Sequence, residues 1–79
     1  MNKEEVFAKL CEIIEDICGR KDMKLETALV KEGILDSLEI INYLTQIEDT
    51  YEISISLDML SEKQLGIIDN MVNFIIENK

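Results

Sequence analysis

The sequence contains no histidine, no proline and no tryptophan, and only two cysteines and three glycines. Without histidine it lacks the commonest base near neutral pH and the commonest metal ligand in proteins. Nucleophilic pairs of serine or cysteine with histidine are therefore impossible. A metal site would have to use carboxylates or the two cysteines, and the Asp-x-Asp-x-Asp-Gly loop of a calcium sensor is absent. We expect no catalytic residues and no metal.

Positive charge is also scarce, with eight Lys and Arg against seventeen Asp and Glu, a formal net charge of −9. Such a chain is repelled by phosphate backbones and anionic lipids, so nucleic acids and membrane surfaces are poor candidate partners. No apolar run is long enough to span a bilayer, and residues 1–5 contain no secretory hydrophobic segment. The acidity serves either solubility alone or a protein partner with a basic face.

The two cysteines, Cys11 and Cys18, fall on the first predicted helix, seven residues apart. Their Cα atoms would then be about 10 Å apart. Because a disulfide needs a separation of less than about 7 Å, an internal bridge is excluded. We interpret both as reduced, apolar helix residues and expect a cytoplasmic protein.

The length of 79 residues, 47% of them hydrophobic, predicts one domain over residues 1–79 with an aliphatic core. A large buried catalytic cleft is not expected at this size. A partner surface or a group mounted on the surface is more reasonable, and we expect a monomer.

Apolar residues recur at helical spacing and predict an all-α four-helix bundle with three main helices and one short helix. The expected helices cover Lys3–Cys18, Ser37–Tyr51, Asp58–Gln64 and Ile67–Asn78. Asn2 is the expected N-cap of the first helix, and Gly19 follows its end. The connection Gly19–Asp36 is long for so small a domain, and such loops are often functional.

Apolar side chains are expected to hold the segments between the helices. In the long connection these are Leu25, Leu29, Ile34 and Leu35. Further along, Ile53, Ile55 and Leu57 alternate as in a strand. Because a lone strand has nothing to pair with, we expect an extended loop that buries alternate residues.

The helix expected over Ser37–Tyr51 has two apolar faces. At about 100° per residue, its core stripe consists of Ile40, Tyr43, Leu44, Ile47 and Tyr51. Leu38 and Ile41 fall outside this stripe, beside Ser37, and form a flank that the core does not need. Asp36 is the expected N-cap, and Glu39 lies in the first turn.

The tripeptide Asp36-Ser37-Leu38, preceded by Gly33-Ile34-Leu35, resembles the attachment motif of acyl and peptidyl carrier proteins. In that family the motif opens the second helix of a four-helix bundle after a long loop, which is where it stands here. The resemblance extends over the whole chain, since residues 60–65 look like the short third helix and residues 68–75 look like the last. It implies that Ser37 carries a covalent 4′-phosphopantetheine arm, with Asp36 helping to present the site.

The start of a helix suits this chemistry, because its unsatisfied N–H groups and partial positive charge favour a phosphate. By resemblance, a separate phosphopantetheinyl transferase supplies the base and a magnesium ion. The resemblance implies that the carrier itself is no enzyme and holds acyl or aminoacyl groups as thioesters. Enzymes of fatty acid, polyketide, peptide or cell-wall biosynthesis with basic surfaces would load and unload it. The implied partner contacts are Leu38, Glu39, Ile41, Glu48 and Asp49.

The cargo stays open. Asn42 and Thr50 stand where fatty-acid carriers are usually acidic, and Ile67 stands where the family often has a capping Ser or Thr. The lead-in before Asp36 is more similar to stand-alone aminoacyl carriers or to the D-alanyl carriers of teichoic acid D-alanylation.

Other interpretations of the same residues also stay open. Taken alone, Asp36-Ser37 would more often be a plain helix cap. The acidic residues of the second helix could be an ordinary solvated face. A non-catalytic helical adaptor without a prosthetic group is the rival from another functional class, and it would bind a partner helix through the flank of Leu38 and Ile41.

Overall fold

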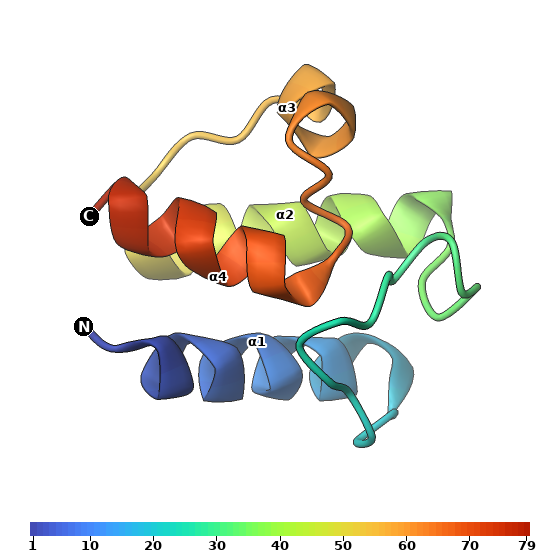
Figure 1. Ribbon diagram of the computed structural model, residues 1–79. Helices are drawn as coiled ribbons and strands as arrows, with labels where there is room; N and C mark the ends of the chain where they lie inside the picture. Colours follow the sequence, from blue (N-terminus) through green and yellow to red (C-terminus); the bar gives the residue numbers. More distant parts are fainter.

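The computed structural model describes residues 1–79 and confirms the all-α bundle (Figure 1). The four helices are α1 (Lys3–Cys18), α2 (Ser37–Tyr51), α3 (Leu57–Glu62) and α4 (Ile68–Glu77). The bounds of α1 and α2 agree with the prediction. The helix α3 begins one residue before the predicted start, Asp58, and ends two residues before the predicted end, Gln64. The helix α4 is one residue shorter than predicted at each end.

The ends of α1 follow its sequence signals. The Asn2 side chain accepts the backbone N–H of Glu5 at 2.8 Å. At the other end Gly19 adopts φ 79°, a left-handed conformation that favours glycine, and its N–H donates to the carbonyl of Glu15 at 2.8 Å. Both ends of the helix are thus satisfied by local residues.

The start of α4 is satisfied by the long loop instead. Ile67 occupies the N-cap position and makes no side-chain capping bond. The N–H groups of Ile68 and Asp69 donate to the carbonyls of Thr27 and Leu25 at 3.0 and 2.8 Å. These donors would otherwise be orphaned at the helix start, so the loop backbone replaces a capping side chain.

The core lies between α1, α2 and α4, and α1 packs against both of the others. The predicted stripe of α2 is confirmed, since Ile40, Tyr43, Leu44 and Ile47 are buried and Tyr51 is half-buried. The predicted anchoring of the long loop is confirmed too: Leu29 and Leu35 are buried, and Leu25 and Ile34 pack against the core.

One core residue carries an unpaired polar group. Tyr43 is fully buried, and its hydroxyl has no hydrogen-bond partner. Burial raises the pKa of this phenol well above its ordinary value, and the neighbouring Cys11 raises it further. The hydroxyl therefore stays protonated at any ordinary pH.

The expectation for the segment after α2 was partly wrong. Ile55 is buried and Ile53 partly buried, but the Leu57 side chain is 61% exposed. Leu57 is the first residue of α3, and Ser56 caps that helix by accepting the N–H of Met59. The chain therefore changes from extended to helical geometry at Leu57, which ends the alternation.

Cys11 and Cys18 are free and half-buried on α1. Burial raises the pKa of the Cys11 thiol, which disfavours the reactive thiolate. None of the helices has the length and apolar character needed to cross a bilayer.

The substitution Ile47→Ala should lower the free energy of unfolding by about 2–5 kcal/mol, because truncating a fully buried side chain leaves a cavity. Ile41→Ala is the matched control on the same helix, and with the side chain 47% exposed the loss should be below about 1 kcal/mol. Urea unfolding followed by circular dichroism measures both. Equal losses would show that the core face of α2 is misassigned.

Candidate functional site

The backbone that leads into α2 is fixed by Leu29. The carbonyl of Leu29 accepts the N–H groups of both Ile34 and Leu35, at 2.8 and 3.1 Å. The turn from Leu29 to Ile34 needs a residue in the left-handed conformation, and Gly33 supplies it with φ 72°. Leu35 is buried, so the chain is anchored in the core two residues before Ser37.

Asp36 and Glu39 form a reciprocal capping box at the start of α2. Asp36 Oδ1 accepts the N–H groups of Leu38 and Glu39 at 3.0 and 2.8 Å. In return, Glu39 Oε1 accepts the N–H of Asp36 at 3.0 Å. This confirms Asp36 as the N-cap and shows that the carboxylates of both residues take part in holding the helix start.

Ser37 is the first residue of α2 and is exposed. The capping bonds use Asp36 and Glu39 and leave the Ser37 hydroxyl and the Ser37 N–H without a partner. The sequence suggested several free N–H groups here, but the capping box already uses those of Leu38 and Glu39. What Ser37 offers is an accessible hydroxyl, one free N–H and the positive end of a 15-residue helix.

The flank beside Ser37 is exposed, as its position on the helical wheel indicated. Leu38 is 78% exposed, the highest value among the large hydrophobic residues of the chain, and Ile41 is 47% exposed. The two residues stand three apart on α2 and therefore on one side of the helix. The Ser37 hydroxyl therefore lies next to an exposed apolar surface formed by Leu38 and Ile41.

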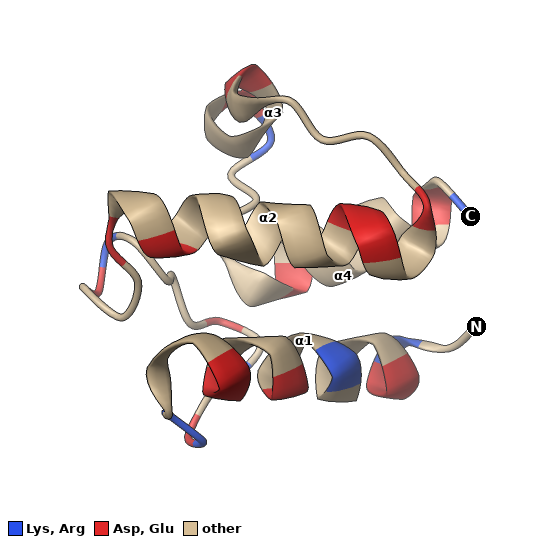
Figure 2. Ribbon diagram, turned by 180° about the vertical axis from the view of Figure 1, so that it is seen from behind, with Lys and Arg blue, Asp and Glu red and all other residues tan.

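The acidic residues of α2 do not form one cluster. Figure 2 shows acidic positions near both ends of α2 and none in its middle. Glu48 begins the second group about 16 Å along the helix from Ser37, and its Oε2 accepts the N–H of Ile55 at 2.7 Å. Asp49 is exposed and makes no hydrogen bond or ion pair. Only Asp49 among the three acidic residues therefore has a carboxylate without a partner inside the protein.

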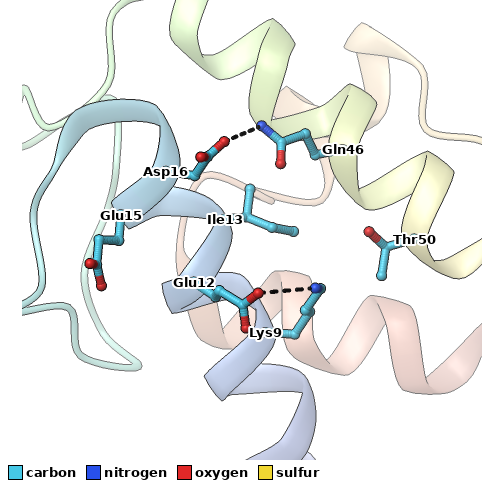
Figure 3. A pocket seen from close by; sticks show the side chains of 7 residues that line it. All are labelled: Lys9, Glu12, Ile13, Glu15, Asp16, Gln46 and Thr50. Carbon is cyan, nitrogen blue, oxygen red and sulfur yellow. Dashed lines mark hydrogen bonds and ion pairs between the residues drawn. The ribbon is translucent and has the colours of Figure 1, made fainter.

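The largest groove of the molecule lies away from Ser37. It has a volume of about 550 Å³ and runs between α1 and α2, as Figure 3 shows. Its lining consists of Lys9, Glu12, Ile13, Glu15, Asp16, Gln46 and Thr50. One hydrogen bond crosses the groove, from Gln46 Nε2 on α2 to Asp16 on α1 at 3.5 Å. Lys9 Nζ lies 3.4 Å from Glu12 on α1 itself. Because Gln46 stands about 13 Å along α2 from Ser37, the groove is no part of this site.

A second groove, of about 430 Å³, borders the long loop. Its lining consists of Ala28, Val30, Lys31, Gln64, Gly66 and Ile67. It follows the isolated backbone bridge between Ala28 and Ile67. Sequence reasoning identified neither groove, because each is built by segments that are far apart in the chain.

Comparison with known proteins gives one match. A family model described as "Phosphopantetheine attachment site" matches residues 8–74, which include Ser37 and its flank. No curated protein and no solved structure matches the chain.

Replacing Asp36 by Ala should lower the free energy of unfolding by about 1 kcal/mol, because the N–H groups of Leu38 and Glu39 lose their acceptor. Ser37→Ala is the neighbouring control and should change it by less than about 0.5 kcal/mol, since its hydroxyl makes no hydrogen bond. Chemical unfolding curves measure both. A loss in Ser37→Ala as large as that in Asp36→Ala would contradict this division of roles.

Proposed function

The chain belongs to the phosphopantetheine attachment-site family, and from this membership we propose that Ser37 is the residue that carries the 4′-phosphopantetheine arm. The family match spans most of the chain and makes the protein a carrier for such an arm rather than a catalytic domain. The observation that supports Ser37 is its hydroxyl, which is exposed and unbonded at the first residue of a long helix.

The other serines of the chain are poorer candidates. Ser54 lies in the extended connection, and Ser61 lies inside the six-residue helix α3. Ser56 caps that helix, and its hydroxyl oxygen accepts the N–H of Met59 at 3.3 Å. Ser37 alone combines a free hydroxyl with the start of a long helix.

The residues around Ser37 fit an attached phosphodiester. The free Ser37 N–H and the positive end of α2 favour a negative charge there. The carboxylates of Asp36 and Glu39 are held by backbone N–H groups, which offset part of their charge. The chain has no histidine to activate the hydroxyl, and we propose that a phosphopantetheinyl transferase supplies the base.

The bound group supplies a thiol on which cargo is held as a thioester. The cargo that we propose is acyl or aminoacyl, exchanged with enzymes of fatty acid, polyketide, peptide or cell-wall biosynthesis. The lead-in Gly33-Ile34-Leu35 favours an aminoacyl cargo, with D-alanine for teichoic acids as the specific alternative.

Partner enzymes are proposed to dock on α2 beside Ser37. Leu38 and Ile41 provide exposed apolar contact. Asp49, Glu39 and Glu48 provide negative charge, which would act mainly on the rate of encounter with basic surfaces. The family match favours a carrier over the alternative function, an adaptor without a prosthetic group. Docking of partner enzymes on a carrier would account for the exposed flank of Leu38 and Ile41.

Intact mass spectrometry tests the attachment site. After incubation with a broad-specificity phosphopantetheinyl transferase, coenzyme A and magnesium, the wild-type chain should gain a single phosphopantetheine. Ser37→Ala should gain none, while the exposed control Ser61→Ala should be modified like the wild type. Modification of Ser37→Ala, or an unmodified wild type beside a working control carrier, would disprove the assignment.

The docking surface is tested by steady-state kinetics of the same transferase. Leu38→Ala should lower kcat/KM about 10-fold, because buried apolar anchors at interfaces contribute more than about 1 kcal/mol. Leu57→Ala is the matched control, since this residue is 61% exposed but lies on α3, and it should change kcat/KM less than about 2-fold. Equal effects of the two substitutions would argue against the flank as the contact surface.

A further inference from the structure

Residues 53–63, which contain α3, are joined to the surrounding helices by one hydrogen bond. It is the bond from the N–H of Ile55 to Oε2 of Glu48, at 2.7 Å. The other hydrogen bonds of this segment stay within it or lead to Gln64 and Leu65, which follow it directly. Figure 1 shows the same arrangement, with an extended connection from the end of α2 and α3 standing apart from the other helices.

Little apolar burial holds this segment. The helix α3 contains no buried residue, and Ile55 is the only buried side chain in residues 53–63. Ile53, Met59 and Leu60 pack against the core while partly exposed. Segments with few buried contacts open at low free energy, so the attachment at Ile55 decides how firmly this one is closed.

Glu48 makes that attachment with a charged acceptor. Hydrogen bonds from an N–H to a carboxylate are shorter and stronger than those between neutral groups. Glu48 is half-buried, and its carboxylate contacts no Lys or Arg of the chain. Its negative charge is therefore available to a cation from outside, even though Oε2 is occupied.

The two kinds of protein cation would treat this carboxylate differently. A guanidinium binds a carboxylate through both oxygens in a fork, so it would compete for the Oε2 that Ile55 uses. An ammonium is a point charge that can bind Oε1 and leave the bond to Ile55 in place. Arginine and lysine on a partner therefore compete with Ile55 to different degrees.

We propose that Glu48 is a latch for residues 53–63, and that a partner arginine bound to its carboxylate releases the Ile55 N–H and loosens the segment. Asp49, the next residue, is exposed and unbonded and can bind partner cations without this effect. Release would uncover the apolar side chains of Ile55, Met59 and Leu60 to the docked partner. The coupling to a partner rests on the proposed carrier function, whereas the latch itself does not.

Amide hydrogen exchange measured by NMR tests the latch. In Glu48→Ala the Ile55 amide should exchange about 10- to 100-fold faster than in the wild type, the range expected for loss of a hydrogen bond to a charged group. The other exchange-protected amides of residues 53–63 should also exchange faster than in the wild type. Glu48→Gln keeps a neutral acceptor and should show a smaller increase. Asp49→Ala removes the same charge one residue away and should leave the exchange rate unchanged.

The core amides of α1 report whether the variants stay folded, and they should keep their wild-type protection. If Glu48→Ala loses that protection as well, Glu48→Gln decides the question in an intact fold. Ile55 exchange in the glutamine variant equal to that of Asp49→Ala would overturn the latch.

Two short peptides test the competition, a tetra-arginine peptide and a tetra-lysine peptide of equal charge. Each is titrated until the amide shifts of α2 stop changing. The arginine peptide should accelerate Ile55 exchange in the wild type several-fold more than the lysine peptide, and neither should accelerate it further in Glu48→Ala. Equal effects of the two peptides, no effect of either, or an effect that persists in Glu48→Ala would overturn the coupling.

These measurements use the chain without modification at Ser37. Failure of the latch with normal modification of Ser37 would leave the attachment site intact. An unmodified Ser37 with a working latch would overturn only the carrier assignment of that serine.

Discussion

The backbone of Leu29 is the point on which the long loop, the start of α4 and the approach to α2 all depend. Its N–H donates to the carbonyl of Gly66 at 2.8 Å, and its carbonyl accepts two N–H groups that precede α2. Its side chain is fully buried, so this junction is fixed in the core. Two neighbouring loop carbonyls satisfy the first donors of α4. One ordered loop therefore takes the place of a capping residue for α4. The same loop gives Ser37 a rigid support.

At the start of α2, the residues that stabilise the fold differ from the residue proposed to carry the chemistry. Leu35 anchors the chain in the core, and Asp36 makes the capping bonds. Ser37 comes next and makes no hydrogen bond through its hydroxyl, while Leu38 points away from the core. A group attached at Ser37 therefore disturbs neither packing nor capping. A serine that served as the N-cap itself would lose its capping bond on modification, because its side-chain oxygen would be shared with the new group.

Sequence patterns predicted α1, α2, their caps and the buried stripe because each of these depends on residues within a few positions of one another. They did not predict how α4 begins, because Ile67 has no capping side chain and its helix uses carbonyls about forty residues earlier in the chain. The exposure of Leu57 was missed because the alternation that includes it stops where Ser56 caps α3. The bond between Glu48 and Ile55 depends on the path of a loop, which periodicity does not encode. The candidate site itself was found from a local motif at a helix start, where the sequence carries most information.

The helix α2 has three faces with different roles, and each face is formed by its own set of residues. One face closes the core against α1 and α4, the flank of Leu38 and Ile41 faces solvent, and Glu48 reaches the connection to α3. No residue of α3 is fully buried, and Met59 and Leu60 of this helix pack against the core while partly exposed. Opening residues 53–63 therefore costs the burial of Ile55 and the partial burial of Ile53, Met59 and Leu60. This is why a single carboxylate, outside the core yet on the same helix as Ser37, can control a segment without endangering the fold.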